Sequence, residues 1–215
     1  MQLFSKSVDA LLRLLLIVTA ALLFGFPMFL FWWVRTPYVT GQFVRYAQPV
    51  LFDHRHHVVD DGINCVYCHV DVDRSPTAGV PPAALCLNCH SQIWNSSPML
   101  QLVWRSDRAR RPIRWQRVNF LPDFVYFDHA IHVQKGIGCE TCHGRVDRMP
   151  RVFQAAPLTM GWCLDCHRDP ARYVRPRNEV TTMGYEPEEP QSVLGPSLVR
   201  AYRIRSITNC TACHR

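Results

Sequence analysis

The 215-residue chain lacks several features that mark common classes of protein. Lysine is almost missing, because only Lys6 and Lys135 are lysine among 24 basic residues and the other 22 are arginine. A net charge of +7 raises the question of nucleic-acid binding, but no recognition motif accompanies the arginines, so we expect no nucleic-acid partner. There is no βαβ pattern, few long periodic segments and no constellation for hydrolysis or hydride transfer. These absences leave the cysteines and histidines to indicate function.

All ten cysteines lie in five copies of one pattern, Cys-x-x-Cys-His. The copies, numbered here as motifs 1 to 5, are Cys65–His69, Cys86–His90, Cys139–His143, Cys163–His167 and Cys210–His214. The pattern is typical of covalent haem c attachment, in which both thiols form thioethers and the adjacent His binds the iron. Zinc sites and disulfide frameworks also use paired cysteines, but neither requires His after the second cysteine in every copy.

The sequence therefore predicts five haems c. The predicted thioether positions are Cys65, Cys68, Cys86, Cys89, Cys139, Cys142, Cys163, Cys166, Cys210 and Cys213. The predicted proximal iron ligands are His69, His90, His143, His167 and His214. Haem faces would replace part of an ordinary apolar core, and ten propionates would turn the charge of +7 into about −3 if all were ionised. Arginine pairs well with carboxylates, so we interpret the arginine excess as propionate neutralisation together with partner docking.

An apolar segment near the N-terminus is long enough to cross a membrane. Residues 14–34 carry no charge, and 21 residues of helix extend about 30 Å. The aromatic pair Trp32 and Trp33, followed by Arg35, is typical of a membrane interface. A signal peptide would have a shorter apolar region that ends at small residues. We therefore predict a single-pass anchor in the bacterial inner membrane, with residues 1–13 cytoplasmic and the haem-bearing remainder on the periplasmic side.

Residues 45–90 and 127–167 are predicted to be two related two-haem units. The segment FDHRHHVVDDGINCVYCHVDVDR aligns with FDHAIHVQK-GIGCETCHGRVDR, with 13 identities and with histidines and cysteines in register. This similarity indicates an internal duplication. An arginine-rich linker at residues 91–126 separates the units, and residues 168–215 form a C-terminal connector that carries the fifth haem motif. We expect a mostly irregular and α-helical multihaem cytochrome c fold with little regular secondary structure.

The five histidines outside the motifs all lie in the two FDH segments: His54, His56, His57, His129 and His132. An iron without open-site chemistry needs a second axial ligand, and five spare histidines match five haems. The pattern Phe-x-His-x-x-His resembles the class III multihaem cytochromes, the cytochrome c3 and c7 group. That resemblance implies distal ligation by His54 and His57 in the first unit and by His129 and His132 in the second.

The distal ligand of the fifth haem is left open by the sequence. His56 is the remaining histidine, but it aligns with Ile131 and the duplication does not require it. Methionine is the alternative axial ligand, and it would raise the potential of that haem. The candidates are therefore His56, Met149, Met160 and Met183.

The chain as a whole is similar to the pentahaem cytochrome c subunit of bacterial alternative complex III, a quinol oxidoreductase. The similarity spans about residues 45–215 and is carried by the segments AGVPPAALCLNCHSQIW, RVNFLPDFVYFDHAIHV, APLTMGWCLDCHR and CTACHR. It implies an electron-transfer subunit without a catalytic site of its own, which receives electrons from menaquinol oxidation. The implied partners are an iron–sulfur subunit, integral membrane quinol-binding subunits, a monohaem cytochrome c subunit, and a soluble electron acceptor or terminal oxidase.

Two other functions deserve comparison with this one. A stand-alone membrane multihaem quinol dehydrogenase that feeds a periplasmic reductase shares the plan of an anchor followed by haems. The FDH duplication and the fifth motif argue against it. A multihaem reductase would need an iron with an open distal position, and the fifth haem is the one whose ligand the sequence does not assign.

Overall fold

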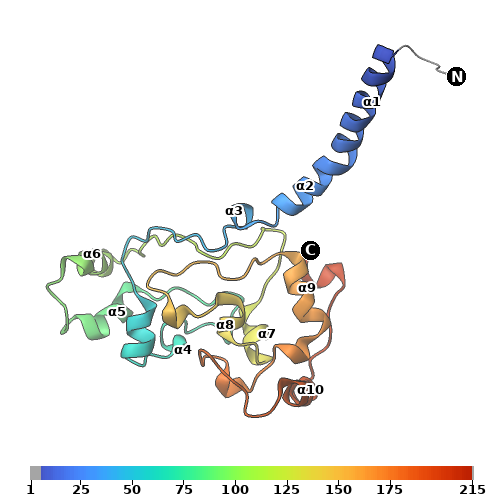
Figure 1. Ribbon diagram of the computed structural model, residues 1–215. Coiled ribbons are helices and arrows are strands. Elements are labelled where there is room, and N and C mark those ends of the chain that lie inside the picture. Colours follow the sequence, from blue (N-terminus) through green and yellow to red (C-terminus); the bar gives the residue numbers. More distant parts are fainter. Residues whose placement is uncertain (1–5, 215) are drawn as a thin grey trace. The chain divides into compact units, whose positions relative to one another are not determined.

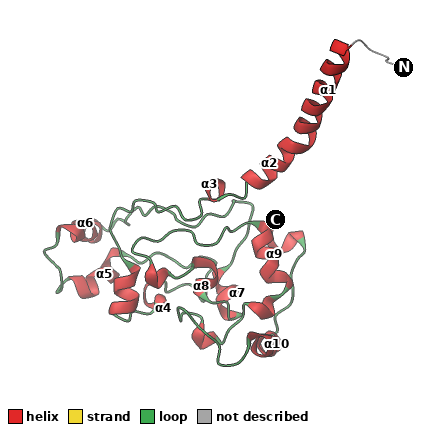
Figure 2. Ribbon diagram, in the orientation of Figure 1, coloured by secondary structure: helices red, strands yellow, loops and turns green. Residues whose placement is uncertain are grey.

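The computed structural model describes residues 6–214, which form two compact units divided after Gly41 (Figure 1). In this described part, helices alternate with irregular segments and no β-strand occurs (Figure 2). The one isolated β-bridge there joins Ile137 to Val174. The predicted fold, mostly helical and irregular, is confirmed.

The N-terminal unit consists of a long apolar helix and one short helical turn. Its elements are α1 (Lys6–Ala20), a π-helical turn (Ala21–Gly25), α2 (Phe26–Trp33) and α3 (Pro37–Thr40). The continuous helix Ser7–Trp33 is long and apolar enough to cross a membrane. It begins before the charge-free residues 14–34, because Arg13 and Asp9 form an ion pair of 2.9 Å one turn apart and are compatible with helix. The π-helical turn ends just before Pro27, which has no N–H to donate to the preceding turn.

The second unit contains eight short α-helices within residues 42–214. They are α4 (Cys65–Cys68), α5 (Ala83–His90), α6 (Gln101–Ala109), α7 (His129–Gln134), α8 (Cys139–His143), α9 (Met160–Arg168), α10 (Gln191–Ala201) and α11 (Cys210–Cys213). A π-helical turn covers His56–Asp60, and single 3₁₀ turns cover Pro98–Leu100, Val146–Arg148, Pro170–Arg172 and Arg177–Glu179. Within this unit, α5 and α6 lie at one end, α9 and α10 at the other, and α7 and α8 between them (Figure 1).

Local capping starts several of the helices that carry motifs. The side chain of Asn64 accepts a hydrogen bond from the amide of Val66 at the start of α4. Thr159 caps α9 in the same way, and Asp128 caps α7, the helix of the second FDH segment. Such caps satisfy amides that lack a partner inside the helix, which matters most for helices as short as these.

Buried apolar residues are few in the second unit. The largest described cluster joins Val50, Ala83, Leu100 and Val103, and Cys86 of motif 2 packs against it. Because α5 supplies Ala83 and α6 supplies Val103, this cluster fixes motif 2 against α6. The other buried residues, such as Val174 and Val180, are scattered along the chain.

Candidate haem-binding sites

Each Cys-x-x-Cys pair lies on one turn of helix, in α4, α5, α8, α9 and α11. Residues three apart in a helix share a face, so both thiols of a motif point to one side. The following His continues the helix in motifs 2, 3 and 4, whereas His69 and His214 come directly after the helix ends. None of the ten cysteines is in a disulfide. Within residues 6–214, no three His, Cys, Asp or Glu side chains converge in the manner of a metal-ion site.

The histidines outside the motifs face the histidines inside them. Three pairs have ring centroids 6.0 to 6.3 Å apart: His57 with His90, His129 with His143, and His132 with His167. Two imidazole nitrogens on opposite sides of one metal ion lie roughly 4 Å apart and each centroid about 1 Å further out, which separates the centroids by roughly 6 Å. These three pairs are therefore spaced as axial ligands of an iron between them.

His54 lies near His69 of motif 1, which has the largest effect on its pKa after burial. The pKa of His54 is lowered to about 4, mainly by burial and then by charge repulsion from His69, His57 and His143. Burial likewise lowers the pKa of His143 to about 4, with His129 and His69 as additional causes. Both rings are therefore neutral at pH 7, the form in which an imidazole nitrogen can bind a metal.

Most of these histidines are oriented by backbone carbonyl groups. Nδ1 lies 2.7 to 3.2 Å from a carbonyl oxygen in His57 (Asp53), His69 (Gly79), His90 (Ile93), His129 (Pro76), His132 (Asp128) and His214 (Phe124). A carbonyl oxygen only accepts, so Nδ1 carries the proton and Nε2 keeps its lone pair. This is the usual outer contact of a metal-binding histidine.

The phenylalanine of each FDH segment contacts both histidines of that segment. The Phe52 ring meets His54 edge-on at 4.7 Å and stacks on His57 at 4.3 Å. Phe127 repeats this arrangement with His129 at 4.7 Å and His132 at 4.6 Å. The phenylalanine occupies the same aligned position in both FDH segments, and that repetition was the one indication in the sequence that it has a role.

Two buried nitrogens lack a hydrogen-bond partner among the described residues, namely Nδ1 of His54 and Nε1 of Trp104. His54 faces motif 1, and Trp104 packs against the cluster that holds Cys86 of motif 2. Buried polar groups are rarely left unpaired in folded proteins. These two atoms, the paired imidazoles and the free thiols make a donor set that fits haem c.

Contacts between the motifs follow a linear order. Burial raises the pKa of Cys68, and the neighbouring Cys86 raises it further. Asn88 also donates to the hydroxyl of Tyr67 at 3.2 Å, which places motif 2 beside motif 1. The neighbouring thiols of Cys65 and Cys139 lower the pKa of Cys65 and raise the pKa of Cys139, which places motif 1 beside motif 3.

The second half of that order runs through motif 4 to motif 5. Burial raises the pKa of Cys142 to about 12, and the neighbouring Cys166 and Cys163 of motif 4 contribute. Burial also raises the pKa of Cys163, with Cys213 of motif 5 as the second cause. The resulting order of neighbours is motif 2, 1, 3, 4 and 5.

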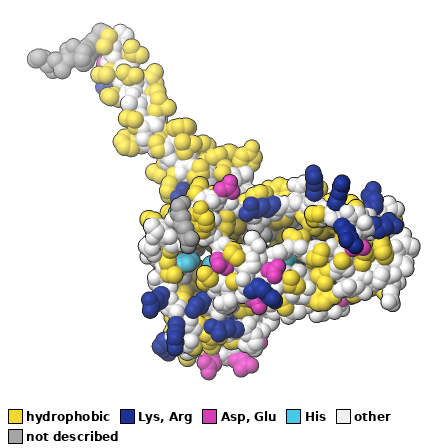
Figure 3. All heavy atoms as spheres, turned by 180° about the vertical axis from the view of Figure 1, so that it is seen from behind, with side chains coloured by type: hydrophobic (Ala, Val, Ile, Leu, Met, Phe, Trp, Pro, Cys, Tyr) yellow, Lys and Arg dark blue, Asp and Glu magenta, His cyan; other side chains and the backbone are white. Residues whose placement is uncertain are grey.

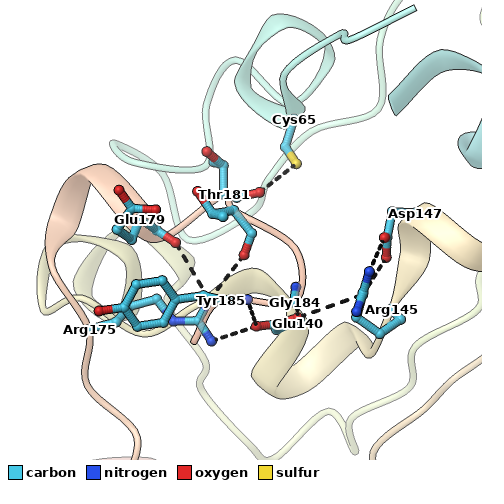
Figure 4. A network of polar contacts seen from close by, with 10 residues as sticks. Cys65, Glu140, Arg145, Asp147, Arg175, Glu179, Thr181, Gly184 and Tyr185 are labelled. Carbon is cyan, nitrogen blue, oxygen red and sulfur yellow. Dashed lines mark hydrogen bonds and ion pairs between the residues drawn. The ribbon is translucent and has the colours of Figure 1, made fainter. Parts of the chain in front are cut away.

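A polar network connects motifs 1 and 3 to the C-terminal connector (Figure 4). Glu140, between the two cysteines of motif 3, accepts from Arg175 at 2.9 Å and from the amide of Gly184 at 2.6 Å. Arg175 is 8% exposed and also donates to the carbonyl oxygen of Thr182 at 3.1 Å. The thiol of Cys65 points at the carbonyl oxygen of Thr181 (Figure 4). The sequence analysis missed this network because Glu140 and Arg175 lie far apart in the chain.

The candidates for the fifth distal ligand lie in different surroundings. His56 is exposed, and its Nδ1 pairs with Asp60 at 3.1 Å. Met149 is 6% exposed and packs beside Gly144, next to motif 3. Met160 is 68% exposed at the start of α9, and Met183 is half-buried beside the Glu140 network. His214 itself lies against Phe124, with ring centroids 5.7 Å apart.

Parts of the chain are similar to known proteins. Residues 125–215 match the family model described as cytochrome c7 and related cytochrome c. The chain is also 32% identical over 127 residues to the multihaem cytochrome c subunit of menaquinone reductase from Nitratidesulfovibrio vulgaris strain Hildenborough. That alignment covers 59% of this chain and 55% of the relative, so the chain spans about half the length of the curated protein it matches. Residues 125–215 are therefore similar to cytochrome c7 and related cytochromes c, and the haem-attachment motifs and paired histidines agree with that similarity.

Proposed function

We propose that this chain binds five haems c and relays electrons from quinol oxidation in a membrane complex to an acceptor outside the membrane. The observation that carries the proposal is the set of facing histidine pairs at motifs 2, 3 and 4, and the hydrogen bond that joins motif 2 to motif 1 supports it. The ten motif cysteines hold the haems and the five motif histidines bind the irons. The distal ligands are His54 for motif 1, His57 for motif 2, His129 for motif 3 and His132 for motif 4.

Bound haem supplies a reversible one-electron change at iron. The residues of this chain determine where that change takes place and keep other chemistry out. Two imidazoles on one iron leave no open position for a substrate, so the paired histidines favour electron transfer over catalysis. The Nδ1 contacts to backbone carbonyl groups fix the ring orientation and the tautomer. Contacts that do not use the thiols, such as the hydrogen bond from Asn88 to Tyr67, hold successive attachment sites side by side.

The quinol link rests on likeness to other proteins and on the apolar helix Ser7–Trp33. The relative described above is named as a subunit of a menaquinone reductase. The similarity to the pentahaem subunit of alternative complex III makes the proposal more specific. Its partners would be an iron–sulfur subunit, integral membrane quinol-binding subunits and a monohaem cytochrome c subunit. The helix then serves as a single inner-membrane anchor, with the larger compact unit that begins at Gln42 on the periplasmic side.

Two measurements test the proposal: the number of covalently bound haems, and the spin state and CO binding of each haem. The pyridine haemochrome spectrum of the denatured full-length chain is expected to give five covalent haems per polypeptide. The intact complex is expected to hold low-spin haems at motifs 1 to 4 and to bind no CO there. A high-spin, CO-binding haem at one of these motifs would exclude the relay and support a reductase. The fifth distal ligand remains a prediction among His56, Met149, Met160 and Met183.

The angles between facing rings add an independent test. The rings of His129 and His143 are 5° from parallel, whereas those of His57 and His90 are at 63°. Parallel imidazoles split the iron d orbitals more than crossed imidazoles do. Electron paramagnetic resonance should therefore show an ordinary rhombic low-spin signal for motif 3 and a strongly anisotropic one for motif 2. The same signal from both would contradict the ligand pairing.

A further inference from the structure

Six exposed arginines gather on α6 and the segment that follows it. This arginine patch consists of Arg105, Arg108, Arg110, Arg111, Arg114 and Arg117. Residues 105–117 contain one acidic residue, Asp107, so the segment has a net charge of +5. Basic side chains cluster at the end of the larger unit that carries α6, and at the other end basic side chains are accompanied by acidic ones (Figure 3).

The arginines face outward because their neighbours face inward. Val103 is 2% exposed, and Ile113 and Trp115 pack against the same apolar cluster. In the extended segment after α6, successive side chains alternate in direction, which turns Arg114 outward between Ile113 and Trp115. The apolar positions thus fix the direction of the patch.

Within residues 6–214, none of the six patch arginines forms an ion pair with a carboxylate. Other arginines of the chain behave differently, because Arg55, Arg145 and Arg175 each pair with an acidic side chain at 2.9 Å or less. Unpaired like charges held on one face repel one another, and an external acidic group would relieve that repulsion.

The patch lies beside one end of the motif order. Helices α5 and α6 pack together, and Cys86 of motif 2 contacts the same cluster as Val103 of α6. Motif 2 touches motif 1 and is the first member of the order. Just after motif 2, Ile93 and Trp94 are 62% and 64% exposed. Exposed aromatic and apolar residues beside arginines are the composition of a protein-binding surface.

We infer that the arginine patch docks an acidic protein carrying a one-electron centre, so that electrons enter or leave the chain at motif 2. The inference rests on the proposed relay function. Arginine suits carboxylates because its planar fork binds both oxygens, and a basic patch opposite an acidic one speeds association. A protein is favoured over an anionic lipid surface because exposed Trp94 offers the apolar anchor that protein interfaces use.

The experiment uses the full-length haem-loaded chain and an acidic donor, flavodoxin hydroquinone, mixed in a stopped-flow instrument. One electron passes from the flavin to one ferric haem, which leaves the flavin semiquinone, a proton and a ferrous haem. The patch variant is Arg105→Glu, Arg108→Glu and Arg111→Glu. The control variant is Arg151→Glu, Arg200→Glu and Arg205→Glu, three exposed arginines elsewhere whose replacement changes the net charge equally.

The patch variant should be reduced at least about tenfold more slowly at low salt, and the control variant within about twofold of the unchanged chain. The rate for the unchanged chain should fall as salt rises, and that dependence should be weaker in the patch variant. Hexaammineruthenium(II), a small cationic donor, should reduce the patch variant faster than the unchanged chain.

Four outcomes would overturn the inference. Equal slowing by both variants would show an effect of net charge alone, and no slowing by the patch variant would exclude docking there. Lost binding to phosphatidylglycerol vesicles in the patch variant, with unchanged flavodoxin rates, would assign the patch to the membrane. If the patch variant has a changed haem potential and the rate of its reduction does not depend on salt, the arginines pair with haem propionates and do not dock a partner. Failure of the proposed relay would look different. In that case the first haem to be reduced would not pass its electron to the other haems, in the unchanged chain and in both variants alike.

Discussion

The two duplicated units have the same histidine geometry but differ in what surrounds it. Phe52 and Phe127 hold their histidine pairs at nearly the same distances. The first unit has one residue more between its FDH segment and its motif. That residue is accommodated by the π-helical turn His56–Asp60, where the second unit has the ordinary helix α7. The comparison shows that an insertion was absorbed in the backbone without moving the side chains proposed to bind iron.

The units also differ at their attachment helices. Asn64 caps α4, and the aligned residue before α8 is Gly138. A Cβ at Gly138 would overlap the guanidinium of Arg175, so a larger residue there would require Arg175 to shift. Val66 of the first unit is 46% exposed, whereas the aligned Glu140 holds Arg175. The second unit is thus anchored to the C-terminal connector, in keeping with its central place in the motif order.

The largest effect should come from removing a distal histidine. His57→Ala is expected to open one iron and convert that haem from low-spin to high-spin with CO binding, because His57 faces His90 at 6.2 Å. The matching change in the second unit, His132→Ala, should do the same at motif 4. Optical and electron paramagnetic resonance spectra in the presence of CO measure both. Fully low-spin spectra in either variant would contradict the shared geometry.

Making the second unit more like the first should have the next largest effect on stability. Glu140→Val leaves the buried guanidinium of Arg175 without its carboxylate and is expected to lower the free energy of unfolding by about 3 kcal/mol. It should also raise the potential of the haem at motif 3, because a nearby negative charge that favours ferric iron is lost. Guanidinium unfolding and potentiometric titration measure the two effects. Glu188→Val, on the exposed connector, is the control, and an equal loss there would remove the role of the network.

Gly138→Ala should cost about 2 kcal/mol, because the methyl group overlaps Arg175 and forces a shift in a packed region. Gly161→Ala is the matched control, since a Cβ there meets no atom within 4 Å and Gly161 lies in helix α9. Alanine at that site should be neutral or slightly stabilising. Thermal unfolding of the haem-loaded variants compares them. Equal melting temperatures would mean that Arg175 can move aside.

The smallest expected effect is a pH dependence at Asp147. The hydrogen bond from Arg145 at 2.8 Å lowers the pKa of Asp147 below its ordinary value of 3.8, against the opposing effect of burial. A lowered folded pKa gives stability that is present above about pH 4 and is lost as pH falls through the folded pKa. Asp147→Asn should remove about 1 kcal/mol at pH 7 and progressively less below pH 4.

Unfolding curves recorded from pH 7 down to pH 3 test this expectation. Asp73→Asn, at the aligned position of the first unit, is the control, because its ion pair with Arg74 is exposed and contributes little. A pH-independent difference between Asp147→Asn and the unchanged chain would exclude the ion pair as its cause.

Much of the candidate site was predictable from local patterns. The motif cysteines and histidines are specified by spacing within one helical turn, and the duplication indicated which other histidines to consider. The contact partners were not predictable. His57 faces His90 rather than His69, which is closer in the sequence. No local pattern specifies which motif a distant histidine will contact. Glu140 and Arg175 escaped notice for the same reason, as they are separated by 35 residues.

The sequence by itself determined the helical and irregular fold class and the apolar N-terminal helix and predicted the haem-attachment positions, because each depends on residues close together in the chain. The tertiary structure alone decided the pairing of histidines, the order of the motifs and the outward direction of the arginine patch. These depend on long-range packing, such as the cluster that joins Ala83 to Val103 and the network around Arg175. Local sequence patterns are compatible with several courses of the connecting loops, and long-range packing decides which one the chain adopts.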